Sequence, residues 1–131
     1  MTHTIDSFIG FYATQDLEAT RDFYTRVLGL ELAVDQGTCH IYRVTDTAFI
    51  GFCQREDSFS TDGILITLVT DDVDVMCERL TSFDVPLEKA PAHNPTYGIY
   101  HAFVRDPNNY LVEIQRFDDP MWRFGDAERA D

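Results

Sequence analysis

The sequence predicts an α+β protein made of two βαβββ modules, whose curled mixed sheets enclose a shared cleft. An extended run, an aspartate cap and an amphipathic helix follow one another twice, in FYATQDLEATRDFYTRVLG (11–29) and in TLVTDDVDVMCERLTSFD (67–84). Runs with the alternation of strands come after each helix. A half of this size cannot bury both faces of its own sheet, so the two halves are expected to share a core.

The first module spans about residues 5–55, with Asp16 as the N-cap of its helix and Gly29 at the end. One stripe of the helix is expected to face the core, and its members are Thr20, Phe23, Tyr24, Val27 and Leu28. The strands expected after this helix are 30–35, 38–44 and 48–54. Turn signals at Gln36-Gly37 and around Asp46 separate these strands.

A hairpin centred on Asp46 sets the register of the last two of these strands. It places Cys39 opposite Cys53 and Ile41 opposite Gly51. Alternate residues then point away from the helix, toward the expected cleft. The predicted ligand-binding residues of this module are Ile9, Phe11, Cys39, Ile41, Phe49, Gly51 and Cys53.

The second module spans about residues 62–117 and repeats this plan, with Asp72 as the N-cap. The apolar stripe of its helix consists of Val73, Met76, Leu80 and Phe83. The strands expected after it are a short run 86–89, then 97–105 and 110–117. The run PAHNPTYG (91–98) has the composition of a loop, and we expect it to border the cleft.

The stretch RDPNNYLVEIQ (105–115) is a turn followed by a strand with a carboxylate, Glu113, in its middle. The turn pairs Phe103 with Glu113 and His101 with Gln115, so these four side chains share one face. Glu113 could face water, bind a metal, or exchange a proton with His101, since imidazole titrates near neutral pH. The remaining candidate ligand-binding residues of the module are Leu65, Thr67 and Tyr97.

The chain is strongly acidic, with 23 acidic residues against 10 basic ones and a net charge of -13. Such a surface repels nucleic acid and anionic membranes, so neither is an expected partner. Such a surface suits a halophilic protein, because a Debye length of about 3 Å at 1 M salt removes most of its self-repulsion. An ordinary acidic protein of a mesophile is the alternative. We expect a cytoplasmic protein, because no run approaches the ~20 apolar residues of a membrane span and the first ten residues do not resemble a signal peptide.

Three cysteines are an odd number, and none lies in a C-x-x-C motif, so neither a disulfide scaffold nor a zinc ribbon is expected. Cys77 is expected to pack in the second helix. The facing pair Cys39 and Cys53 is most simply explained as two small buried hydrophobic residues. The pair could also bind a soft metal or an electrophile, or form a disulfide.

Two runs, DLEATRDFYTRVLGLEL (16–32) and FVRDPNNYLVEI (103–114), resemble the vicinal-oxygen-chelate superfamily of glyoxalases, bleomycin resistance proteins and extradiol dioxygenases. The resemblance covers about residues 5–117 and implies a single glyoxalase/bleomycin-resistance-like domain over 1–117, with a tail at 118–131. Asn109 replaces the family's usual glycine, which is possible because Asn tolerates a positive φ. The resemblance also implies a homodimer, with Trp122 and Phe124 of the tail packed against a partner or the domain surface.

Metal-dependent members of the family use positions that correspond here to Ile9, Gly51, Leu65 and Glu113. Only Glu113 can bind a metal, whereas a divalent ion needs at least two or three protein ligands. We therefore expect binding of a small organic molecule in an apolar cleft, without the family's metal centre. One alternative is a metal-dependent lyase or dioxygenase with Glu113 as ligand or base, assisted by His101. The other is thiol-based binding of a soft metal or an electrophile at the cysteine pair.

Overall fold

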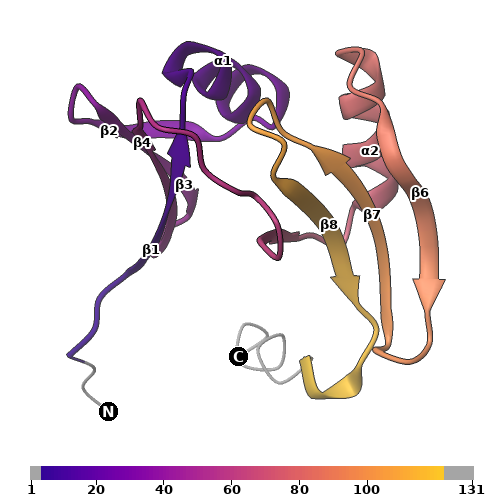
Figure 1. The fold of residues 1–131 in the computed structure, drawn as a ribbon. Helices are drawn as coiled ribbons and strands as arrows, with labels where there is room; N and C mark the ends of the chain where they lie inside the picture. The colour runs from indigo at the N-terminus through magenta and orange to yellow at the C-terminus, as the bar shows by residue number, and fades with distance from the viewer. Residues whose placement is uncertain (1–3, 123–131) are drawn as a thin grey trace. The chain divides into compact units, whose positions relative to one another are not determined.

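The computed structural model describes residues 4–122, and its elements follow the order βαβββ twice (Figure 1). Two four-stranded mixed sheets result, which confirms the predicted fold class. The chain divides into two compact units, which are described separately. The first comprises the residues up to 62 together with 106–109, and the second comprises 63–105 with the residues from 110 onward.

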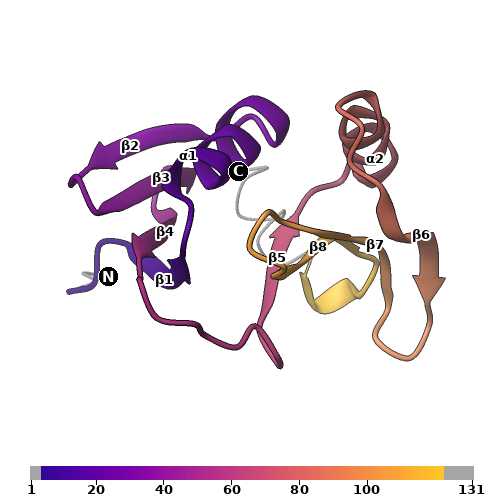
Figure 2. The ribbon, with the colours of Figure 1, turned by 45° about the horizontal axis from the view of Figure 1, so that its top comes forward.

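The first unit is a sheet in the order β1-β4-β3-β2, in which β1 is parallel to β4 and the other pairs are antiparallel. Its elements are β1 (Phe8–Thr14), α1 (Leu17–Asp22), the π-helical segment η1 (Phe23–Val27), β2 (Glu31–Asp35), β3 (Cys39–Thr45) and β4 (Ala48–Gln54). α1 lies against β3 and β4 (Figure 2).

The predicted helix ends of the first unit are confirmed. Oδ1 of Asp16 accepts a hydrogen bond from the amide of Ala19 at 3.0 Å, as an N-cap should. Gly29 adopts φ 82°, the left-handed conformation that closes many helices. The π-helical turn was not predicted; in it the amide of Leu28 donates to the carbonyl of Phe23.

Aromatic rings form the core between the helical segment and the sheet. The buried ring of Tyr24 lies 4.7 Å from that of Phe52 and stacks on that of Tyr42 at 5.7 Å. The hydroxyl of Tyr24 donates to the buried carboxylate of Asp106, at 2.8 Å. The turn 106–109 is thereby held within this unit. Asn109 has φ 72° there, as predicted.

The second unit is a sheet in the order β5-β8-β7-β6, with β5 parallel to β8 and the other pairs antiparallel. Its elements are β5 (Leu65–Val69), α2 (Val73–Ser82), β6 (Leu87–Asn94), β7 (Ile99–Arg105), β8 (Leu111–Phe117) and a 3-10 turn (Pro120–Trp122). α2 packs on β6, β7 and β8 and buries Val73, Cys77 and Leu80. Asp72 is the cap residue, although its side chain makes no capping hydrogen bond.

The second strand of the second module, β6, is longer than predicted. The strand expected over 86–89 is the start of β6, whereas the loop expected over 91–98 was wrong in its first half, because β6 runs to Asn94 and only 95–98 form a turn. The register of β6 against β7 shifts twice, between Leu87 and Lys89 and between Lys89 and Ala92. Pro91 is tolerated because these shifts lie in an edge strand, where a missing amide donor costs little.

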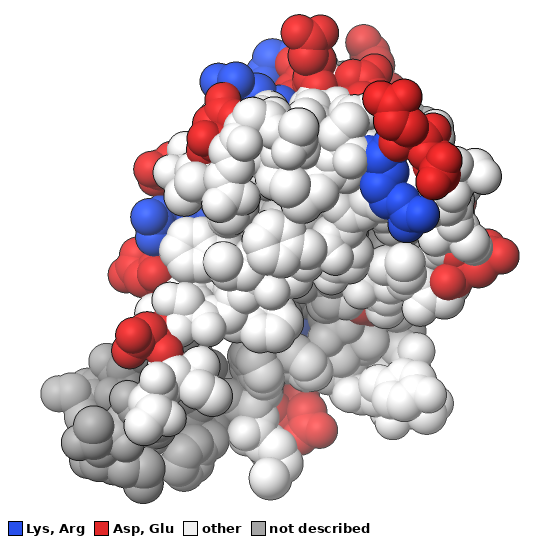
Figure 3. Space-filling view, turned by 60° about the vertical axis from the view of Figure 1, so that its left-hand side comes forward, with Lys and Arg blue, Asp and Glu red and all other residues white. Residues whose placement is uncertain are grey.

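Beyond β8, the ring of Trp122 stacks on that of Phe117 at 4.3 Å. Trp122 therefore contacts its own unit, while Phe124 lies outside the described residues. Over residues 4–122, no helix is long and apolar enough to cross a membrane. Figure 3 shows one face of the molecule, on which Asp and Glu side chains project at the surface, several of them beside Lys or Arg.

Candidate functional site

The face of the second sheet that lies opposite α2 carries the predicted polar residues. Phe103 pairs with Glu113 and His101 with Gln115, which confirms the predicted register. Thr67 of β5 pairs with Glu113 from the other side. Glu113 is thus central in the sheet, with Thr67 opposite it on β5 and His101 diagonal to it on β7.

These strands form one wall of a pocket of about 390 Å³. Its lining residues are Leu65, Asn94, Tyr97, Ile99, His101, Glu113, Gln115 and Phe117. Five of these residues were predicted from the sequence, whereas Asn94, Ile99 and Phe117 were not. Ile99 and Phe117 continue the alternation of His101 and Gln115 along their strands, so the same pattern could have found them. Asn94 fell in the stretch that was interpreted as a loop.

Glu113 is bound to His101 inside this wall. Nδ1 of His101 lies 2.5 Å from Oε2 of Glu113, and the side chains are 8% and 7% exposed. The hydroxyl of Thr67 donates to Oε1 of Glu113 at 2.7 Å. Gln115 satisfies its hydrogen bonds with its amide nitrogen turned toward Glu113, to which it donates at 3.0 and 2.8 Å. Three side chains, those of Thr67, His101 and Gln115, therefore form hydrogen bonds with the carboxylate of Glu113.

This arrangement assigns the donor of the bond for an ionised carboxylate of Glu113. An ionised carboxylate only accepts hydrogen bonds, and Glu113 already accepts from Thr67 and Gln115. Nδ1 of His101 is then the donor in the bond to Oε2. The ring of Phe103 packs edge-on against the imidazole, with centroids 4.8 Å apart, and helps to fix its orientation.

The predicted residues of the first module all lie on one face of the first sheet. The register pairs Ile9 with Phe49, Phe11 with Gly51, and Ile41 with Gly51. The ring of Phe11 lies over Gly51, where an added Cβ would come within 2.6 Å of ring atoms. A larger residue at position 51 would displace the ring of Phe11 from this place. The 390 Å³ pocket includes none of these residues, since its lining comes from the second unit.

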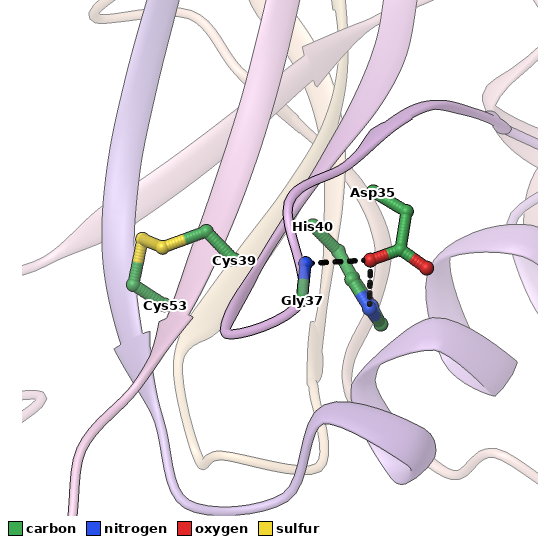
Figure 4. The surroundings of a disulfide bond; sticks show 5 residues. All are labelled: Asp35, Gly37, Cys39, His40 and Cys53. Carbon is green, nitrogen blue, oxygen red and sulfur yellow. Dashed lines mark hydrogen bonds and ion pairs between the residues drawn. A yellow bond between two sulfur atoms is a disulfide. The ribbon is translucent and has the colours of Figure 1, made fainter.

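Cys39 and Cys53 are joined by a disulfide bond across β3 and β4 (Figure 4). Their interpretation as two small buried hydrophobic residues was therefore wrong, although their predicted pairing is confirmed. The register brings their Cα atoms to 4.1 Å, and both residues are only half-buried. Both sulfur atoms are used in the bond, so the disulfide form has no free thiol here for a soft metal or an electrophile.

Cys77 is one of the buried residues of α2, as predicted, and burial raises the pKa of its thiol. It borders a larger depression of about 610 Å³ along α2 and β6. Oδ1 of Asp74 in its lining already accepts from the hydroxyl of Tyr100 at 2.6 Å, and the lining within residues 4–122 holds no pair of titratable side chains hydrogen-bonded to each other as His101 and Glu113 are. The pocket around His101 and Glu113 is therefore the stronger candidate, although it is smaller.

The side chains at the family's metal positions do not fit a divalent ion. Ile9, Gly51 and Leu65 have no donor atom, and the carboxylate of Glu113 is already hydrogen-bonded by three side chains. Within residues 4–122, no three His, Cys, Asp or Glu side chains are grouped so that they could hold an ion. His101 and Glu113 instead form a pair that is stabilised by hydrogen bonds.

Comparison with known proteins identifies the relatives of this chain. The family model of the Glyoxalase/Bleomycin resistance protein/Dioxygenase superfamily matches residues 3–114. A lactoylglutathione lyase of Arabidopsis thaliana is 28% identical over 141 residues, which cover 91% of this chain and 49% of that protein. The chain thus spans about half the length of this curated relative.

Solved structures share the fold at low identity. A lactoylglutathione lyase from Agrobacterium tumefaciens has a TM-score of 0.68 and 21% identity, covering 82% of this chain and 90% of the other. A glyoxalase/bleomycin resistance protein/dioxygenase from Alicyclobacillus acidocaldarius has a TM-score of 0.72 and 18% identity, covering 92% and 98%. At these identities the likeness extends to the fold alone.

Proposed function

The chain belongs to the glyoxalase/bleomycin resistance protein/dioxygenase superfamily, and from this premise we propose that it binds a small organic molecule in the pocket of its second unit. One observation carries the proposal. Two titratable side chains, His101 and Glu113, lie hydrogen-bonded to each other in the wall of a pocket that is otherwise largely apolar. Binding sites of proteins commonly combine apolar walls with a few fixed polar groups in this way.

The size and lining of the pocket agree with such a ligand. A volume of about 390 Å³ lies within the usual range of roughly 300–1,000 Å³ for small-molecule sites. Leu65, Ile99 and Phe117 supply apolar surface, while His101, held by Glu113, supplies a hydrogen-bonding group. A molecule with one apolar part and one polar part would match both kinds of lining residue.

The proposed binding does not use the family's metal centre. Only one of the four corresponding positions has a ligand side chain, and that side chain, Glu113, is bonded to His101. A metal-dependent lyase or dioxygenase reaction has no support from the residues at these positions. Lyase activity therefore belongs to the similar proteins that are named for it, and we do not propose it for this chain.

A matched pair of substitutions on β5 tests the proposal. Leu65 and Val69 lie on the same face, are 49% and 46% exposed, and differ in that Leu65 lines the pocket. Leu65→Trp should fill the pocket and lower the affinity of every ligand that a thermal-shift screen of small organic molecules finds for the wild-type chain. Val69→Trp should leave their affinities unchanged. Equal binding by both variants would move the ligand away from this pocket.

We also propose that the chain forms a homodimer, as members of the superfamily commonly do. Large apolar side chains that are exposed in the first unit, such as Phe8 and Phe11, are candidates for burial in the interface. Light scattering in molar KCl should give the mass of two chains. A monomeric mass under these conditions would refute the proposal.

A further inference from the structure

We infer that the ligand of this pocket is an uncharged molecule with an apolar ring and a hydroxyl group, and that the hydroxyl donates a hydrogen bond to Nε2 of His101. The inference rests on the proposed function, because it names the chemical class that the same pocket would bind. It follows from the orientation of His101, from the sign of the charge around it, and from the apolar lining.

The orientation of His101 is fixed by its partner. Nδ1 donates to Glu113, so the neutral imidazole carries its one proton on Nδ1 and an unshared electron pair on Nε2. His101 lines the pocket, and Nε2 is the ring atom left for a ligand. A lone pair on nitrogen accepts a hydrogen bond, so the complementary ligand group is a donor such as a hydroxyl.

Thr67 and Gln115 act as positioning residues for this acceptor. Both donate to Glu113, which keeps the carboxylate in place and leaves its oxygen atoms occupied. Glu113 in turn holds the imidazole, and Phe103 packs against the ring. Nε2 is therefore an acceptor whose direction is set before a ligand arrives, which reduces the entropy lost on binding.

The charge of the site excludes anionic ligands. The pocket lining contains the carboxylate of Glu113 and neither Lys nor Arg. The whole chain carries a net charge of -13, which repels anions as they approach. A carboxylate or a phosphate ester would meet repulsion without a compensating cation, whereas a neutral hydroxyl compound would not.

The apolar walls favour a ring over a sugar-like or peptide-like molecule. Leu65, Ile99 and Phe117 offer hydrocarbon and aromatic surface, which gains free energy when a hydrophobic group covers it. A sugar-like or peptide-like ligand would place donors and acceptors against these three side chains, where they would find no partner. A hydroxylated ring satisfies both the walls and Nε2.

The first test concerns the protein without ligand. Nitrogen-15 NMR of the imidazole rings distinguishes the two neutral tautomers, and the exposed His93 provides an internal reference. We expect His101 to show a protonated Nδ1 and an unprotonated Nε2. A protonated Nε2, whether in the neutral ring or in an imidazolium, would overturn the inference, whatever the pocket binds.

The second test compares 2-naphthol with 2-methoxynaphthalene, which has the same ring system and lacks the hydroxyl donor. Fluorescence titration of the wild-type chain should give about tenfold tighter binding of 2-naphthol, the effect of one hydrogen bond. In His101→Asn, the amide nitrogen can take the place of Nδ1 and donate to Glu113, but no atom takes the place of Nε2. The preference for 2-naphthol should therefore vanish. In His101→Gln, whose amide reaches the position of Nε2, part of the preference should return.

The outcomes separate the inference from the proposed function. Equal binding of the two probes, blocked by Leu65→Trp, would overturn the hydroxyl contact and leave the pocket as a binding site. A preference for 2-naphthol that persists in His101→Asn would place the hydroxyl elsewhere and overturn the inference. Failure of both probes to bind would count against a ring-binding pocket altogether. If His101→Asn does not fold, His101→Gln and the NMR measurement still decide the question.

Discussion

The imidazole of His101 and the carboxylate of Glu113 meet at 2.5 Å, although the two residues are not paired in the sheet. They are diagonal neighbours on β7 and β8, which brings long side chains on the same face within reach. Both side chains are buried, so removal of either one would leave the other without this partner. The pair therefore contributes to stability as well as to the pocket, and substitutions can separate the two roles.

Glu113→Ala should destabilise the protein far more than Glu113→Gln. Alanine leaves the buried donors on Thr67, His101 and Gln115 without an acceptor, which should lower the free energy of unfolding by about 3 kcal/mol. Glutamine keeps the shape and an acceptor oxygen, so we expect a loss of about 1 kcal/mol. Urea unfolding measures both. Changes within about 0.5 kcal/mol for both variants would mean that Glu113 is only a solvated strand residue.

Two buried tyrosines of the first unit provide a matched pair. Tyr24 donates its hydroxyl to the buried carboxylate of Asp106, so Tyr24→Phe should lower the free energy of unfolding by about 2 kcal/mol. The buried hydroxyl of Tyr42 has no hydrogen-bond partner among residues 4–122, so Tyr42→Phe should be neutral or slightly stabilising. Urea unfolding of both variants tests the assignment, and equal losses would contradict it.

Tyr42 should also make the protein less stable at alkaline pH. Desolvation raises its pKa from 10.0 to about 12, so above pH 10 the unfolded state loses this proton while the folded state keeps it. The contribution is complete below pH 10 and is lost as the pH rises toward 12. The difference in stability between the wild type and Tyr42→Phe, measured at pH 8 and pH 11 by urea unfolding, should therefore shift in favour of the variant. A difference that does not change with pH would refute the shift.

The fold was largely predictable because local patterns of the sequence agree with one another. Alternation and the turn near Asp46 determined the register of β3 and β4, and the Asp16 cap marked the start of the helix. The π-helical turn was missed because an apolar stripe does not distinguish i+4 from i+5 hydrogen bonds. The extent of β6 was missed because Pro91 argues against a strand unless the bulges around it are known.

The site was predictable only as far as strand alternation reaches. It placed His101, Glu113 and Gln115 on one face, but the direction of hydrogen bonds depends on side-chain rotamers that a pattern does not contain. The disulfide shows a similar limit. An odd number of cysteines argued against a bridge, whereas the register makes Cys39 and Cys53 close neighbours and leaves Cys77 apart.

The acidic surface should make stability depend on salt. With a net charge of -13, the folded state is destabilised by repulsion that molar KCl screens, so the melting temperature should rise between dilute buffer and about 2 M KCl. A variant that neutralises the exposed residues Glu56, Asp57 and Asp62 to Gln, Asn and Asn should show a smaller rise. Calorimetry at both salt concentrations measures the effect. A melting temperature that does not rise in the wild type would count against halophilic adaptation.

The disulfide should stabilise the first unit, and thiol titration should detect it. In denaturant without reductant, thiol titration should find one free cysteine, Cys77, and after reduction it should find three. The bond joins residues 14 apart, and closing a loop of this length restricts the unfolded chain by about 3 kcal/mol in the chain-entropy model. Reductant should therefore lower the free energy of unfolding by up to about this amount.

The double variant Cys39→Ala with Cys53→Ala is the control, because its stability should be insensitive to reductant. Three free thiols before reduction would show that the bond is absent in solution. Loss of stability on reduction in the double variant as well would mean that the reductant acts elsewhere.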